Sequence, residues 1–119
     1  MAEQADELRD RTKRFAIRIV NLFRSLPRRE EARVIGQQVL RSGTSVAANY
    51  RAVCRARSKA EFIAKMGLVV EENDETIFWL ELLVDCGIVR RERMNALIQE
   101  AGELLSIFAA SQRTAKLRG

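Results

Sequence analysis

The side chains best suited to binding another molecule are the basic residues in the middle of the chain. Residues 33–60 hold six Arg or Lys side chains and no acid. On a helix with 100° per residue, four of these side chains fall within about 80° of one another. Cationic groups along one face can bind nucleic-acid phosphates without reading the sequence. The candidate contacts to RNA or DNA are Arg28, Arg29, Arg41, Arg51, Arg55 and Lys59.

A second interpretation of the same basic face stays open. Residues 61–89 hold seven acids and one base, so the basic face can instead pair with acids of the following helix. The halves of the chain differ accordingly, with a net charge of +8 over residues 1–60 and −3 over residues 61–119. If the face binds nucleic acid, Tyr50 is placed to stack on a base beside Arg51.

Catalytic chemistry has little support in the sequence. There is no His, which removes the commonest general base and metal ligand. Cys54 and Cys86 stand 32 positions apart, unlike the spacing of a zinc or redox motif, and we expect two free thiols. The acids of residues 71–75 spread around a helix instead of converging. We therefore expect no enzyme activity, no cofactor and no metal site.

Four helices must position these residues, over about 5–26, 29–56, 58–86 and 91–116. Apolar residues recur in alternating steps of three and four, which is typical of helices that bury one stripe. Pro27 ends the first helix, Ser58 and Glu61 form a capping box for the third, and Gly87 closes it. Gly43 predicts a kink in the second helix, or a short break re-capped by Thr44 or Ser45.

The predicted fold is all-α, a single up-down-up-down four-helix bundle over residues 1–119 with left-handed crossings. Two polar residues, Asn49 and Asn73, fall on the core stripes of the second and third helices. A buried amide must find partners or it destabilises the fold, so such a residue often sets the register of a bundle.

The third helix carries apolar side chains on its outer side as well. Leu68, Phe78, Trp79 and Leu82 lie away from the core stripe. Such a patch on an outer face predicts an interface with a second copy of the chain, because a lone subunit would expose it. The alternative is that wide helices or the chain terminus cover it internally.

The N-terminal segment has no apolar stretch typical of a signal peptide, and no apolar run reaches about 18 residues. We therefore expect a cytoplasmic protein without a membrane partner.

Three stretches resemble a known family: "SVAANYR", "RSKAEFIAKM" and "EENDETIFWLELL". They resemble small bacterial four-helix-bundle proteins encoded in intervening sequences of large-subunit ribosomal RNA genes. The chain is also similar to the accessory variability protein of diversity-generating retroelements, which works with a reverse transcriptase. The resemblance implies a ring oligomer, typically a homopentamer, and supplies no catalytic residue. This chain departs from the family pattern at the start of the last helix. Family members often have an acid or a hydroxyl side chain there, whereas this chain has Arg90 and Arg91.

The hypothesis from the sequence is therefore a non-catalytic homo-oligomer that associates with RNA or DNA, as an accessory to a nucleic-acid enzyme. The alternative is a structural or protein-interaction module that binds no nucleic acid.

Overall fold

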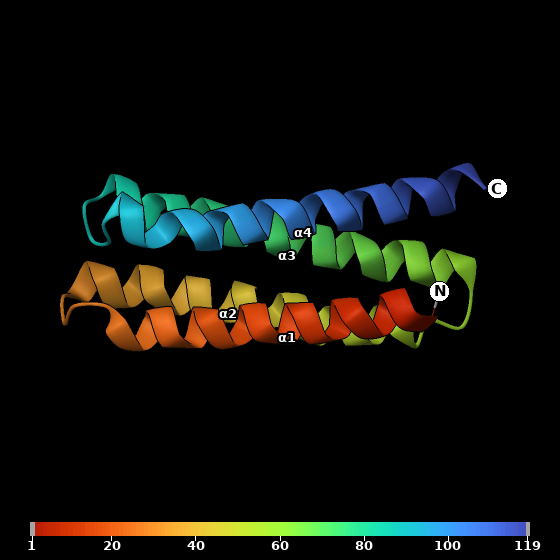
Figure 1. The fold of residues 1–119 in the computed structure, drawn as a ribbon, viewed down its shortest axis with the longest axis horizontal. Helices are drawn as coiled ribbons and strands as arrows, with labels where there is room; N and C mark the ends of the chain where they lie inside the picture. Colours follow the sequence, from red (N-terminus) through yellow and green to blue (C-terminus); the bar gives the residue numbers. More distant parts are fainter. Residues whose placement is uncertain (1, 119) are drawn as a thin grey trace.

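The computed structural model describes residues 2–118, which form four antiparallel helices in a rod of 48 × 22 × 21 Å. These are α1 (Ala2–Ser25), α2 (Glu30–Cys54), α3 (Lys59–Asp85) and α4 (Arg91–Leu117). Helices α1 and α2 form one layer and α3 and α4 the other, with both chain termini at the same end (Figure 1). The all-α four-helix fold is as predicted, whereas the handedness of the crossings and the ring assembly stay predictions.

The helix ends follow from local chemistry. Helix α1 ends just before Pro27, and the Oγ of Ser58 accepts a hydrogen bond from the Glu61 N–H at 3.0 Å at the start of α3. Gly87 has φ of 72°, the left-handed conformation that glycine adopts without strain. Helix α2 ends two residues earlier than predicted, because the Arg55 and Ala56 N–H groups turn back to the carbonyls of Ala52 and Val53.

Helix α2 passes through Gly43 without interruption, so the predicted alternative of a break is wrong. Gly43 is fully buried against α1, and a Cβ at this position would lie 2.8 Å from Cγ1 and 2.9 Å from Cγ2 of Ile19. The glycine therefore permits the Ile19 side chain of α1 to pack directly against the backbone of α2. The hydroxyl of Thr44 bonds to the Leu40 carbonyl at 2.7 Å within the continuous helix.

The core is a single apolar cluster along the axis of the rod, and it follows the predicted stripes of α1 and α4. In α2 and α3 the buried stripe is displaced. Tyr50 is buried where Asn49 was predicted. On α3, steps of three and four through Asn73 favour either Val70 and Ile77 or Val69 and Thr76 as core residues, and the structure buries Val69 and Thr76. The buried residues of α3, from Met66 to Leu83, still step by three and four, so the spacing alone does not decide which of the two sets is buried.

None of the helices in residues 2–118 has a stretch that is long and apolar enough to cross a membrane.

The close approach at Gly43 gives a test of the packing. Gly43→Ala should lower the free energy of unfolding by about 1 kcal/mol, because overpacking against Ile19 costs more than the gain in helix propensity. Gly102→Ala is the matched control, since a Cβ there meets nothing within 4 Å, and it should raise stability by about 1 kcal/mol. Urea denaturation measures both. Equal gains in the two variants would contradict the packing assigned to Gly43.

Candidate nucleic-acid interface

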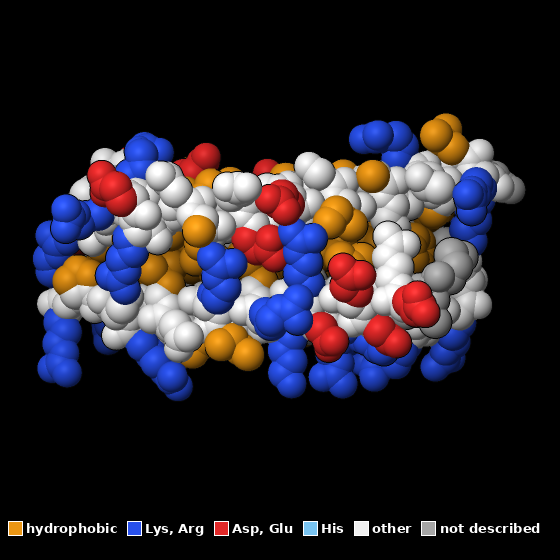
Figure 2. Space-filling view, viewed as in Figure 1, with side chains coloured by type: hydrophobic (Ala, Val, Ile, Leu, Met, Phe, Trp, Pro, Cys, Tyr) orange, Lys and Arg blue, Asp and Glu red, His pale blue; other side chains and the backbone are white. Residues whose placement is uncertain are grey.

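The charge difference between the halves of the chain becomes a difference between the two layers of the fold. Residues 1–60, which include α1 and α2, carry a net charge of +8, and residues 61–119, which include α3 and α4, carry −3. Figure 2 shows Lys and Arg side chains along the lower edge of the molecule, over α1 and α2. This basic layer, defined as α1, α2 and the connections that flank α2, is the part of the described chain best suited to attract a polyanion.

Arg41 does not extend freely from this layer. Its guanidinium lies 3.1 Å from a carboxylate oxygen of Glu72 and also pairs with Glu75, both on α3. For this residue the alternative interpretation, pairing with acids of the third helix, is therefore the one that the structure supports. The ion pairs join the two layers and reduce the charge that Arg41 offers to an external phosphate.

The other predicted contacts lie at opposite ends of the rod. Arg51, Arg55 and Lys59 are exposed at the end where the chain termini lie, and none has an ion-pair partner among residues 2–118. Arg28 and Arg29 lie at the other end, in the connection between α1 and α2. Arg29 is 3.9 Å from Glu31, and Arg28 has no ion-pair partner within the same described residues. The six side chains thus form two separate basic groups with Arg41 between them.

The prediction that Tyr50 stacks on a nucleic-acid base is wrong. The side chain is only 5% exposed, and its ring packs against Phe108 of α4 with 5.5 Å between ring centroids. Burial raises the pKa of the Tyr50 hydroxyl above its ordinary value, because the ionised form would lose its hydration.

The two core amides predicted from the sequence differ. Asn49 is only half-buried and is not a core residue, because Tyr50 takes the inward position on α2. Its amide instead donates to the Ser45 carbonyl at 3.0 Å and to the Ser45 hydroxyl at 2.7 Å. Asn73 is fully buried, and its amide nitrogen and oxygen make no hydrogen bond to any of the described residues. Such an amide carries the cost of desolvation without compensation.

The outer face of α3 remains apolar in the folded chain. Leu68 is 50% exposed and Phe78 is 54% exposed, whereas Trp79 and Leu82 are half-buried. The Trp79 ring lies edge-on to Phe78 and donates its N–H to Glu75 at 2.9 Å. The rest of this chain therefore covers the patch only in part.

Sequence reasoning missed an ion-pair network between α1 and α4. Arg11 donates to Glu100 at 2.8 and 2.7 Å and to Glu103 at 2.8 Å. Its guanidinium lowers the pKa of the half-buried Glu100 carboxyl through these hydrogen bonds. The partners are 89 and 92 positions away, so no local pattern signals them. Helices α1 and α4 are also the most sparsely packed pair of neighbouring helices, which makes this network their main polar link.

The described residues contain no group of three Cys, Asp or Glu side chains placed to hold a metal ion. Cys54 is the last residue of α2, and Cys86 follows the far end of α3. These free thiols therefore lie at opposite ends of the rod, too far apart to form a disulfide within the chain. The chemistry that this surface can support is the binding of anions by exposed guanidinium and ammonium groups.

The fold and this surface define the class of protein: an antiparallel four-helix bundle with one basic layer. A sequence model described as "23S rRNA-intervening sequence protein" matches residues 6–110, and the chain belongs to this family. It is similar to a crystal structure from Bacteroides thetaiotaomicron, a protein of unknown function from the S23 ribosomal protein family. The TM-score is 0.85 at 34% identity, over 92% of this chain and 97% of that one.

A comparison with curated protein sequences gave no match. The resemblance to the retroelement accessory protein is tested by neither match and stays a prediction.

The Arg11 network predicts a specific dependence of stability on pH. Because the folded-state pKa of Glu100 is lowered, the stabilisation is present above the ordinary carboxyl pKa of 4.5 and is lost as pH falls through the lower value. Arg11→Gln should lower the free energy of unfolding by about 1 kcal/mol at pH 7, and this difference from wild type should shrink at acid pH. Urea denaturation at several pH values measures it. Lys13→Gln, an exposed change on the same helix, should show no such pH dependence.

Proposed function

We propose that the protein is a non-catalytic, homo-oligomeric helical bundle that associates with RNA or DNA through its basic layer. The observation that carries this proposal is that Arg51, Arg55 and Lys59 stay exposed and without ion-pair partners among residues 2–118. Other basic residues, Arg11 and Arg41, are held by acids of the second layer. The free cations are therefore those that the bundle does not use for its own stability.

The contacts would be to phosphate groups and would not read sequence. The exposed cations stand on helices and at helix ends without an element that could enter a groove and read base edges. Association of this kind weakens steeply as salt concentration rises, because each phosphate contact releases condensed counterions. The partners we propose are RNA or DNA and, in the cytoplasm, an enzyme that acts on nucleic acid, such as a reverse transcriptase.

Assembly into a ring, which we propose to be a pentamer, would strengthen such binding. The apolar outer face of α3, with Leu68 and Phe78 half-exposed, is where a second copy would bury exposed apolar side chains. Repetition of the same weak phosphate contacts around an oligomer multiplies them into high avidity.

The second candidate function is a structural or protein-interaction module in which positive charge serves assembly alone. The ion pairs of Arg41 with Glu72 and Glu75 favour it, because they show basic residues of α2 meeting acids of α3. Between two copies, the same pairing would join the basic layer of one copy to the layer of α3 and α4 in the other, which carries the net negative charge.

A binding titration across salt concentrations separates the two candidates. Fluorescence anisotropy with labelled RNA at low salt should give measurable affinity, which Arg51→Gln combined with Arg55→Gln lowers about tenfold or more. The matched control is Arg113→Gln with Lys116→Gln, which removes the same charge from the exposed surface of α4 and should have a smaller effect. Absence of binding at low salt, or equal losses in the two double variants, would reject the role of the basic layer.

The assembly has its own test. Phe78→Glu should convert the oligomer into a monomer without loss of helix content, because the wild-type side chain is 54% exposed within the subunit. Light scattering after gel filtration and circular dichroism measure the two quantities. Ser106→Glu introduces one acid on the exposed side of α4 as a control and should leave the assembly intact. A wild-type monomer at micromolar concentration would contradict the assigned interface.

A further inference from the structure

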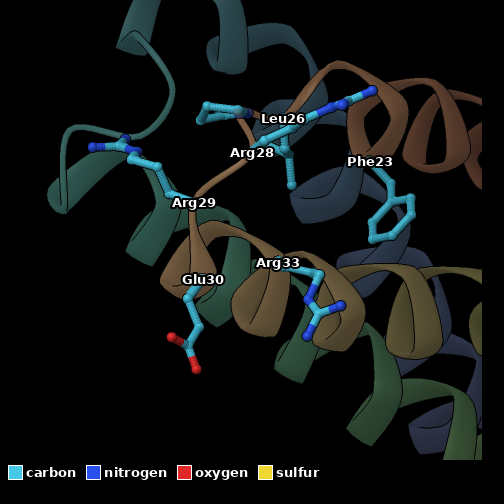
Figure 3. Close-up of a pocket in the computed structure, with 7 residues that line it drawn as sticks. Phe23, Leu26, Arg28, Arg29, Glu30 and Arg33 are labelled. Atoms are coloured by element: carbon cyan, nitrogen blue, oxygen red, sulfur yellow. The ribbon is translucent and has the colours of Figure 1, made fainter.

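A groove with an apolar floor and arginine walls lies at the turn between α1 and α2. Its volume is about 520 Å³, in the range of small-ligand sites. The floor is formed by Phe23, Leu26 and Pro27, and the remaining lining residues are Arg28, Arg29, Glu30 and Arg33. In Figure 3 the Arg28 side chain lies above the level of the Phe23 ring and the Arg33 side chain below it, whereas Arg29 and Glu30 lie on the far side from the ring. The groove therefore combines an aromatic surface with two cations.

The floor exists because Gly36 has no side chain. A Cβ at Gly36 would lie 2.6 Å from Cδ1 of Leu26 and 3.3 Å from Cδ1 of Phe23, so both side chains rest against the backbone of α2. The packing of these two side chains against α2 holds the apolar floor in place between α1 and α2. The groove is thus a feature of the packed bundle.

The two arginines that flank the floor are available to a ligand. Arg28 and Arg33 are exposed, and neither has an ion-pair partner among residues 2–118. A guanidinium group presents paired N–H donors that match two oxygens of a phosphate. The Arg90 side chain is also exposed at this end of the rod, in the connection between α3 and α4, and it too lacks an ion-pair partner within the described chain.

We propose that this groove binds one unpaired nucleotide of a single-stranded nucleic acid. The base would lie against Phe23, Leu26 and Pro27, and the adjoining phosphates would accept hydrogen bonds from Arg28 and Arg33. The inference rests on the proposed association with nucleic acid and specifies its substrate class. A base paired in a duplex is stacked between its neighbours and cannot reach Phe23, so the groove selects single strands, loops or ends. Arg90 would contact the strand as it continues across the end of the rod.

The experiment uses the full chain and a single-stranded RNA that carries one 2-aminopurine, whose fluorescence reports stacking. Arg28→Gln with Arg33→Gln should lower the affinity for this RNA about tenfold or more, because two phosphate contacts are removed. The matched control, Arg24→Gln with Arg93→Gln, removes the same charge from exposed positions at the same end of the rod but outside the groove lining, and should cost only about two- to threefold. Circular dichroism confirms that each variant is folded.

A conservative variant separates base contact from charge. Phe23→Leu keeps an apolar side chain in the floor and should change affinity only modestly, but it should abolish the 2-aminopurine fluorescence change. Wild-type protein should also prefer the single strand over a duplex of the same sequence. Together these results would support a nucleotide in the groove.

Different failures have different meanings. Equal losses in the two double variants, duplex binding as tight as single-strand binding, or an unchanged fluorescence response in Phe23→Leu would overturn the groove and leave the basic layer in place. No binding of any nucleic acid at low salt would overturn the proposed function and the groove with it. Binding of an acidic, leucine-containing peptide more tightly than RNA, lost in Arg28→Gln with Arg33→Gln, would assign the groove to a protein partner and overturn the proposal.

Discussion

The close packing of α1 against α2 is the constraint on which the rest of the molecule depends. These helices and the connections beside them hold a net charge of +8, so their charges repel each other in the folded state. Apolar contact must hold them together, and it does so where α2 has no side chain: Ile19 fits against Gly43, and Leu26 and Phe23 fit against Gly36. Because the interior of this layer is occupied by apolar groups, its cations lie on the outside.

Two ion-pair networks then divide the basic residues into two kinds. Arg41 reaches Glu72 and Glu75 on α3, and Arg11 reaches Glu100 and Glu103 on α4, so each network joins the two layers. These contacts lower the repulsion within the basic layer, and the Arg11 network also stabilises the bundle where α1 and α4 pack sparsely. The cations at the two ends of α2 have no such partners among the described residues. The division shows which charges serve the fold and which are available to an external anion.

The sequence was sufficient to predict the fold and insufficient to predict the site. The helices and their ends could be predicted because they depend on neighbouring residues. The signals were the alternating steps of three and four and the residues Pro27, Ser58 and Gly87. The exchange of Asn49 for Tyr50 at the core of α2 could not be predicted, because either residue fits the alternation of three and four between Val46 and Val53. The partners of Arg11 could not be predicted either, because they lie 89 and 92 positions away and depend on how the helices are placed. For Arg41 the sequence indicated acids of the third helix as one alternative, but it did not select Glu72 and Glu75.

The rod shape makes self-association and nucleic-acid binding compatible. An interface through Leu68 and Phe78 lies on the side of the rod, about midway along α3, so it would bring copies together with their long axes side by side. The groove at Phe23 and the cations at Arg51 and Arg55 lie at the ends, which such an assembly leaves uncovered. In a ring, equivalent ends of neighbouring copies would face the same direction and form one continuous circle of guanidinium groups. A flexible single strand can follow such a circle, whereas a stiff duplex, with a persistence length of about 150 base pairs, resists bending over that distance.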